Sequence, residues 1–197
     1  MNTSKALKLI SFFSLFLGLS FANLLYAQAP YKLAGKPEIK VMGGSTLHDW
    51  EMVSAQSQGK AEMTVEGSAI TGVSAAQVSL KAESLKSGKD KMDGIAYETL
   101  KTKKHPNIQF TLTSYKNLDG KKGLATGNLT IAGTTKPVTL AVNSVVKNGV
   151  VSLTGEAPIK FSDFNMAAPT AVFGTIKTTN DLKIQFKVNF QQVNSSI

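Results

Sequence analysis

The stretch that decides the fold is Leu182-Lys183-Ile184-Gln185-Phe186-Lys187-Val188-Asn189-Phe190. Large apolar side chains occupy every second position, and lysine, glutamine or asparagine stands between them. Because side chains alternate between the two faces of a β-strand, this pattern predicts a strand with one buried and one hydrated face. The same alternation recurs at 62–66, 77–81, 108–113 and 138–143. The sequence therefore predicts an all-β protein.

Turn residues separate these runs. Asn148-Gly149 and Asp119-Gly120 are each typical of a tight hairpin, because such residues tolerate positive φ. Further division of the sequence is expected at Gly67, Gly72 and Gly133. The pattern gives about eight or nine candidate strands at regular spacing, which is typical of a β-sandwich or an up-and-down barrel. No repeat or linker interrupts it, so we expect one domain.

Two stretches lack the alternation. Residues 90–101 carry apolar side chains at helical spacing, among them Met92 and Leu100, and they end ahead of Pro106. This predicts a short helix crossing the barrel. Residues 162–179 are rich in apolar side chains without a strand period, and they predict a loop in place of a strand.

Residues 1–27 are typical of a secretory leader. Two lysines precede an uncharged apolar run over residues 9–25, and Ala27 supplies the small residue that a signal peptidase requires. A run of about 17 apolar residues is short for a membrane span of about 20. We therefore expect cleavage after Ala27, which leaves a single domain over residues 28–197 outside the cytoplasm.

The composition narrows the range of partners. All 22 basic residues are lysine, against 13 acidic residues, and the chain has no cysteine. Disulfides, thiol catalysis and cysteine metal sites are therefore excluded. Proteins that read nucleic acids depend on arginine forks and aromatic stacking, whereas these lysines are scattered. We expect no nucleic-acid partner, and at most a weak attraction to anionic membrane surfaces.

The sequence offers little for catalysis. Neither His48 nor His105 has ligand spacing to another histidine or to a carboxylate, so we expect no metal site and no cofactor. Ser45 precedes His48 closely, but proximity does not make a triad. His48 and Asp49 would point to opposite faces of a strand. We therefore expect no catalytic residues.

Trp50, the only tryptophan, has two interpretations. It is either a core residue with a hydrogen-bonded indole N–H, or part of a cavity wall that touches a ligand. The same ambiguity holds for Tyr97, Phe164, Met166 and Phe173, because apolar residues in irregular segments either cap a core or close a barrel where ligands enter.

Several ordered segments suggest a family: GSTLHDW at 44–50, MD at 92–93 continuing to Leu100, HPNIQF at 105–110, ATGNLTIAGTTKPV at 125–138, and FSDFNM at 161–166 leading to FGTIK at 173–177. On these segments the chain resembles the YceI-like family of exported lipid-binding proteins, over nearly all of residues 31–190. The resemblance implies an eight-stranded antiparallel lipocalin-like barrel, a periplasmic location, and an apolar interior that holds a polyisoprenoid or similar long-chain amphiphile. The family often carries an arginine in the part corresponding to 161–164, and this chain has none.

We therefore expect a non-enzymatic binding or carrier protein whose ligand lies inside the barrel, with the helix and the loop covering one end. The expected interior residues are Phe110, Leu112, Leu129, Ile131, Leu140, Val142, Leu153, Ile159, Phe161, Ile184 and Phe186. The expected cover consists of Tyr97, Leu100, Phe164, Met166 and Phe173. Together with Trp50, the ligand contacts are expected to be Tyr97, Leu100, Phe110, Leu112, Phe161, Phe164, Met166, Phe173, Ile184 and Phe186.

Other functions stay open at this point. An eight-stranded barrel is just wide enough to fill itself with side chains or to hold one slender ligand, and a filled barrel would make a structural or interaction protein of the cell envelope. A lipid hydrolase using His48 and Asp49 is a further alternative, and so is an outer-membrane barrel. About ten aromatic residues beyond the leader are few for the two girdles of an outer-membrane barrel. The oligomeric state, a dimer among the options, also stays open.

Overall fold

The computed structural model describes residues 28–193. Its strands are β1 (Ala29–Ser45), β2 (Trp50–Ser54), β3 (Ser57–Glu66), β4 (Ala69–Lys81), β5 (Asn107–Asn117), β6 (Lys122–Ile131), β7 (Thr134–Lys147), β8 (Val150–Lys160), β9 (Thr170–Ala171) and β10 (Ile176–Gln192). Its helices are α1 (Asp90–Thr99) and the short 3-10 helices η1 (Ala82–Ser84) and η2 (Phe161–Phe164).

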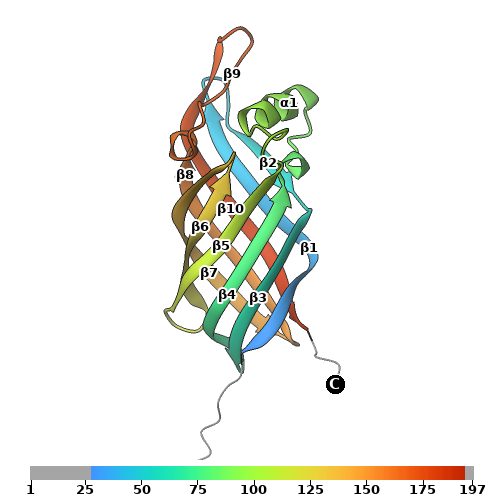
Figure 1. Ribbon diagram of the computed structural model, residues 1–197, viewed down its shortest axis with the longest axis vertical. Helices are drawn as coiled ribbons and strands as arrows, with labels where there is room; N and C mark the ends of the chain where they lie inside the picture. Colours follow the sequence, from blue (N-terminus) through green and yellow to red (C-terminus); the bar gives the residue numbers. More distant parts are fainter. Residues whose placement is uncertain (1–27, 194–197) are drawn as a thin grey trace, which may run out of the picture.

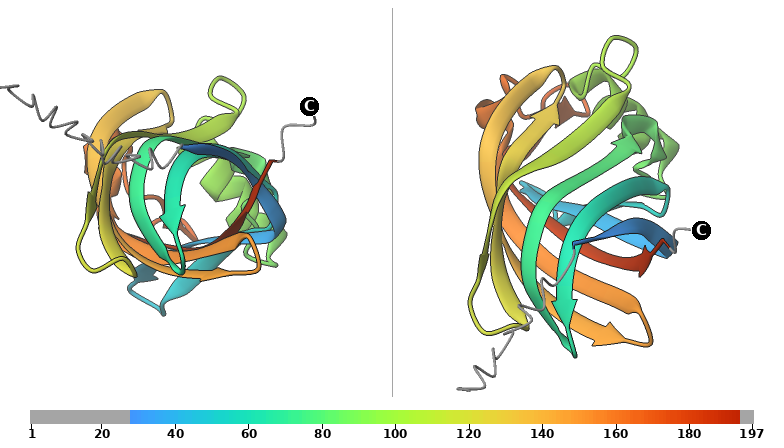
Figure 2. Two further views of the ribbon diagram at one scale, coloured as in Figure 1. Left: turned by 90° about the horizontal axis from the view of Figure 1, so that it is seen from below. Right: turned by 60° about the horizontal axis from the view of Figure 1, so that its bottom comes forward.

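Eight of the strands close into an antiparallel barrel, seen from the side in Figure 1 and from below in Figure 2. Strands β3 to β8 pair in chain order, and β8, β10, β1 and β3 complete the ring. The β1–β10 pairing runs from Tyr31 opposite Gln192 to Ser45 opposite Thr178. The predicted eight-stranded antiparallel barrel with one short helix is confirmed.

Strands β2 and β3 lie one after the other along the same edge of β1. Strand β2 pairs with Ile39–Gly43 of β1, and β3 pairs with Ala29–Lys32. Between these two pairings β1 bends at a register shift, and Gly35 adopts a φ of +73° there. Glycine adopts this left-handed conformation without steric cost.

The two ends of the barrel differ. Helix α1 and the β9–β10 hairpin lie at the upper end in Figure 1, and we call this the α1 end. The β3–β4, β5–β6 and β7–β8 turns lie at the other end, which we call the far end. The far end also holds the first residues of β1 and the last residues of β10.

Most of the predicted turns are found. Asn148 and Gly149 join β7 to β8 with φ values of 51° and 75°. The prediction for Gly72 was wrong, because this residue lies inside β4, opposite Thr64. Register shifts on both sides of it bend the strand, and such bulges are where a strand tolerates glycine.

The prediction of a loop over 162–179 was wrong for its last residues. Strand β10 begins at Ile176, ahead of the clear alternation that starts at Leu182. Polar residues from Thr178 to Asp181 hide the period in the sequence. These residues form a strand because they pair with β1, where Ser45 lies opposite Thr178. The alternation of side chains does not reveal this pairing.

Candidate functional site: an apolar cavity inside the barrel

A cavity of about 1060 Å³ lies inside the barrel. All eight barrel strands contribute to its lining, and so do β2, α1 and the β9–β10 hairpin. Nearly all of the lining side chains are aliphatic or aromatic. The charged ones, Lys89, Asp90 and Lys91, lie together at the start of α1. The cavity therefore presents carbon along its length and charge only at the α1 end.

The alternation of β10 explains the lining. Leu182, Ile184 and Phe186 point into the cavity, whereas Lys183 and Lys187 are exposed on the outer face. Each barrel strand repeats this division, because closing a sheet directs one face of every strand inward. The sequence pattern thus becomes an apolar inner wall and a mainly polar outer wall that carries scattered lysines.

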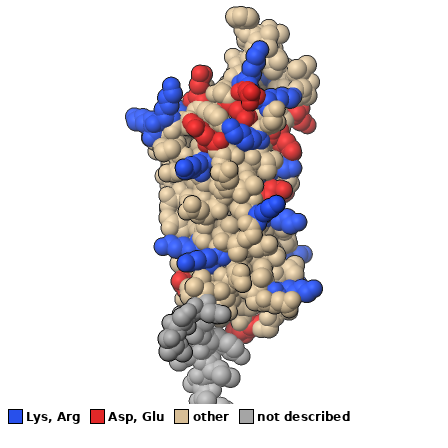
Figure 3. All heavy atoms as spheres, turned by 90° about the vertical axis from the view of Figure 1, so that its right-hand side faces the viewer, with Lys and Arg blue, Asp and Glu red and all other residues tan. Residues whose placement is uncertain are grey.

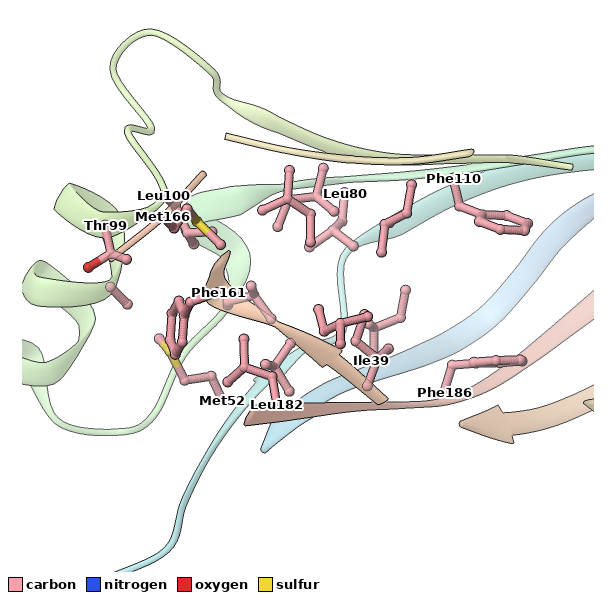
Figure 4. Close-up of a pocket in the computed structure, with 18 of the residues that line it drawn as sticks. Ile39, Met52, Leu80, Thr99, Leu100, Phe110, Phe161, Met166, Leu182 and Phe186 are labelled. Carbon is pink, nitrogen blue, oxygen red and sulfur yellow. The ribbon is translucent and has the colours of Figure 1, made fainter. Parts of the chain in front are cut away.

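Large inward side chains leave the cavity open because their rings lie over glycines of the neighbouring strand. A Cβ atom on Gly155 would come within 2.5 Å of the Phe186 ring, and one on Gly127 would come within 2.5 Å of the Phe110 ring. Figure 4 shows both rings extending along their strands and not across the cavity. These glycines leave room for the rings, and the sequence interpretation missed them.

Packed side chains close the far end of the cavity. A buried cluster there consists of Tyr31, Ala61, Met63, Ile70, Val151, Val188 and Phe190. Several members of the cluster, among them Met63, Ile70 and Phe190, also line the cavity floor. A ligand could pass this end only by displacing the cluster, so entry is expected from the α1 end.

The α1 end forms the mouth. Three segments line it: Leu47 and His48 of the β1–β2 turn, residues 89–92 with Ile95, Ala96, Thr99 and Leu100 around α1, and residues 169–173 before β10. Figure 4 shows Leu100, Met166 and Phe161 near α1, with Phe110 and Phe186 farther along the barrel.

The cavity lining includes most of the residues that the sequence indicated. From the expected ligand contacts it contains Trp50, Leu100, Phe110, Leu112, Phe161, Met166, Phe173, Ile184 and Phe186. From the rest of the expected interior it contains Leu129, Ile131, Leu140, Val142, Leu153 and Ile159. Trp50 combines its two interpretations, because its Nε1 donates a hydrogen bond to the main-chain oxygen of Gly44 (3.2 Å) while its ring lines the cavity.

Tyr97 and Phe164 were expected at the site, but neither lines the cavity. The Tyr97 hydroxyl shares its one hydrogen between the main-chain oxygens of Glu83 (2.9 Å) and Leu85 (3.0 Å), which fastens α1 to η1 and the residue after it. Phe164 is 1 % exposed and packs in a buried cluster with Leu129 and its neighbours. Both residues therefore stabilise the structure around the cavity without lining it.

Some lining residues were missed by the sequence interpretation. Ile39 and Val41 of β1 and Met52 of β2 all line the cavity. A short alternation is present over 39–41, but the bend of β1 shortens it below the length that signals a strand.

Asp93 holds the start of α1 in place over the mouth. Its Oδ1 accepts hydrogen bonds from the Ser87 main-chain N–H (2.8 Å) and hydroxyl (2.7 Å), and Lys86 Nζ lies 3.7 Å from Oδ2. Burial alone would raise the pKa of Asp93, but the Ser87 hydrogen bonds and the Lys86 charge outweigh burial and hold this pKa below its usual 3.8.

Replacing this carboxylate should loosen the cover of the mouth. We expect Asp93→Ala to lower the free energy of unfolding by about 1–3 kcal/mol, because it leaves the Ser87 donors without their acceptor. A folded-state pKa below the unfolded value means that the stabilisation is complete above about pH 4 and is lost as the pH falls through the folded-state pKa. Thermal unfolding between pH 7 and pH 3 should show the variant converging on the wild type. Glu98→Ala, an exposed change on the same helix, is the matched control, and a pH-independent difference for Asp93→Ala would contradict the argument.

The residues considered for catalysis lie in the β1–β2 turn at the mouth. The Ser45 hydroxyl donates to the main-chain oxygen of His48 (2.8 Å), and His48 Nδ1 lies 2.8 Å from the main-chain oxygen of Asp49. These contacts shape the turn and do not align the serine with the imidazole. Over residues 28–193, no group of three or more His, Cys, Asp or Glu side chains could hold a metal ion. No helix within that range is long and apolar enough to span a membrane.

The family model described as the YceI-like domain matches residues 41–190, which is most of the chain. The chain belongs to the YceI-like family. The match covers every strand of the barrel apart from the first part of β1 and the last residues of β10. The resemblance inferred from the sequence segments is therefore confirmed.

Solved structures share the fold of this YceI-like chain at low sequence identity. BcnA of Burkholderia cenocepacia is 18% identical, with a TM-score of 0.64 over 78% of this chain and 95% of that one. A polyisoprenoid binding domain from Saccharophagus degradans is 12% identical, with a TM-score of 0.62 over 84% and 99%. The YceI protein of Campylobacter jejuni is 24% identical, with a TM-score of 0.57 over 70% and 82%. None of the curated proteins matches the chain.

Proposed function

We propose that this YceI-like protein binds and carries a long-chain apolar lipid inside its barrel, with a polyisoprenoid as the ligand class that fits best. The observation that carries the proposal is the cavity of about 1060 Å³, lined by carbon, packed shut at the far end and open at the α1 end. A tube of this kind suits a flexible hydrocarbon chain with a polar head at the mouth. The fold shared with the polyisoprenoid binding domain of Saccharophagus degradans supports the same ligand class.

The size of the cavity argues against the filled-barrel alternative. A void needs only about 10–15 Å³ to admit one water molecule, so a cavity of about 1060 Å³ is far beyond a packing defect. Its carbon lining offers water few hydrogen-bond partners, and an apolar ligand gains about 0.8 kcal/mol per buried CH₂. Ordering costs reduce the net gain to roughly 0.3 kcal/mol per heavy atom for large ligands. A tail of about 40 carbons then reaches on the order of 12 kcal/mol, which corresponds to nanomolar affinity.

A role without catalysis is supported by the polar groups around the mouth. A hydrolase would need a nucleophile and a base held within hydrogen-bond reach of each other. Ser45 and His48 instead use their polar atoms on main-chain oxygens of their own turn. We therefore propose binding and release of the lipid without turnover.

We also propose that the protein works in the periplasm after removal of residues 1–27. These residues lie outside the described part of the chain, so their sequence is the basis for the proposal. The first strand begins at Ala29, so cleavage after Ala27 would leave the barrel intact.

Mass spectrometry of protein exported by cells that express the full chain tests both proposals. We expect an organic extract of native protein to contain a long isoprenoid or a comparable lipid, because nanomolar binding survives purification. We expect the intact mass to correspond to a chain that begins at Gln28. An extract without lipid, together with no shift of Trp50 fluorescence or thermal stability on adding isoprenoids, would sink the carrier proposal. An intact leader would sink the export proposal.

A further inference from the structure

We propose that an apolar tip at the cavity mouth inserts into anionic lipid bilayers, so that the ligand passes directly between membrane and barrel. The tip consists of Leu47 in the β1–β2 turn and of Val172 and Phe173 in the β9–β10 turn. The proposal rests on the proposed function, because it identifies the surface from which a lipid carrier would load.

The tip exposes large apolar side chains to water. Phe173 is fully exposed (110 %), Leu47 is 65 % exposed, and Val172 is 62 % exposed. Figure 3 shows the hairpin that carries two of them as the uppermost tan protrusion, above a shoulder of charged side chains. At this exposure Phe173 buries almost no apolar surface in the barrel, and exposed apolar side chains that lie together mark a membrane or ligand-binding surface.

The backbone conformation of the β9–β10 turn is unfavourable for large apolar residues. Val172 and Phe173 have φ values of 50° and 55°, and the Gly174 N–H donates to the Ala171 main-chain oxygen (3.1 Å), which closes a tight turn. Glycine and asparagine are the residues that accept the left-handed region most readily, and a β-branched or bulky residue there is strained. The protein therefore holds two apolar side chains outward at a conformational cost, as functional sites often do.

The two turns that form the tip are fastened together. The Thr46 main-chain N–H donates to the Lys177 main-chain oxygen (2.9 Å), and the Lys177 N–H donates to the Thr46 hydroxyl oxygen (3.1 Å). Thr179 Oγ1 adds a hydrogen bond to the Gly44 main-chain oxygen (3.2 Å). Leu47 and Phe173 are therefore presented by one braced unit, which can enter a bilayer without first being ordered.

The charges around the tip suit an anionic lipid surface. Residues 164–180 contain Lys177 and no acidic residue. Lys89 and Lys91 line the other side of the mouth, and the segment 101–104 adds three exposed lysines beside the end of α1. Asp90 also lies on the rim and Asp49 is exposed in the β1–β2 turn close to Leu47, so the attraction comes from the excess of lysine over these acids. A lysine near an anionic membrane strengthens binding by about fivefold.

Continuity with the cavity identifies the occupant of the tip as a bilayer and not a folded protein. Leu47, Val172 and Phe173 belong to the same lining as the interior residues of the barrel. Because the tip borders the same cavity as the interior residues, a hydrocarbon tail could leave a membrane core for the barrel with little exposure to water.

Vesicle sedimentation tests the proposal with the exported protein. We expect the wild type to bind vesicles of phosphatidylcholine with phosphatidylglycerol, and to bind pure phosphatidylcholine vesicles more weakly. Removing one inserted phenylalanine corresponds to about tenfold to a hundredfold in a partition constant, so Phe173→Asp should lower binding by that factor. The variant should fold, because aspartate tolerates a left-handed φ better than phenylalanine does.

Leu118→Asp is the matched control, because Leu118 is 53 % exposed in a turn at the far end and should contribute nothing to docking. Lys177→Gln should weaken binding to the anionic vesicles alone, by about fivefold at low salt. Absent wild-type binding, or equal binding by Phe173→Asp and the wild type, would overturn the proposal. The vesicles contain no isoprenoid, so this outcome is independent of whether lipid is extracted from the native protein.

Discussion

Ala76→Trp should shorten the lipid that the protein retains. Ala76 is a small residue of β4 that lines the cavity and packs against the buried cluster at the far end. Tryptophan adds about nine heavy atoms there, and each displaced ligand atom is worth roughly 0.3 kcal/mol, so a long tail should lose about 3 kcal/mol, or about a hundredfold in affinity. Shorter tails that end above this position should bind as before. Mass spectrometry of the extracted lipids would show the distribution moving to shorter chains.

A series of variants separates loss of space from loss of fold. Ala76→Leu should shift the lipid distribution by less than Ala76→Trp, because it fills less of the same space. Ala75→Trp is the matched control, since Ala75 is exposed on the outer face of the same strand and should leave the extract unchanged. The cavity assignment would have to be abandoned if Ala76→Trp kept the wild-type lipid distribution while Ala75→Trp altered it.

The sequence predicted the barrel well wherever burial alone shapes a strand. In β10 the period from Leu182 to Phe190 results directly from one face packing inward, so the pattern and the structure agree. The secondary-structure prediction was less accurate where pairing with a strand distant in the sequence keeps the backbone extended. Residues 176–179 are strand because β1 lies beside them, and Gly72 sits in a strand because bulges accommodate it. Neither the pairing with β1 nor the bulges around Gly72 can be read from the local sequence.

Side-chain alternation predicted most of the residues of the cavity wall. It could not show whether the barrel encloses an open cavity or is filled by these side chains. Inward positions follow from alternation, so Phe110, Ile184 and Phe186 could be named in advance. Whether their rings cross the lumen depends on what stands opposite them on the next strand. Gly127 and Gly155 became informative only once the register placed them beneath those rings.

Cover residues were the least predictable part of the site. Helical spacing and apolarity placed Tyr97 with Leu100, yet the structure turns the Tyr97 hydroxyl toward main-chain oxygens of η1 and the following residue. Phe164 was indistinguishable by composition from Met166, and only the 3-10 turn of η2 sends it into the core. Short irregular segments set side-chain direction through tertiary contacts, which a periodicity does not contain.

Gly155→Ala should both destabilise the barrel and reduce its cavity. A Cβ atom on Gly155 would clash with the Ala141 main-chain oxygen and would lie 2.5 Å from the Phe186 ring. The backbone oxygen cannot move without disturbing the β7–β8 pairing, and overpacking of this kind costs about 1–3 kcal/mol. The Phe186 ring must swing off the wall into the lumen, where it takes the place of ligand. We expect a lower midpoint in urea unfolding and less lipid per mole of protein in the extract.

Gly72→Ala provides the comparison, because it makes the same chemical change inside a strand without the clash. The nearest atom to a Cβ on Gly72 is Thr64 Oγ1 at 3.7 Å, an ordinary contact. Replacing glycine where the backbone permits it stabilises a protein by about 0.4–1 kcal/mol through the unfolded chain. The two variants should therefore move the unfolding midpoint in opposite directions, and only Gly155→Ala should lose lipid. Equal midpoints and equal lipid content in the two variants would show that the Phe186 ring does not depend on Gly155 to stay against the wall.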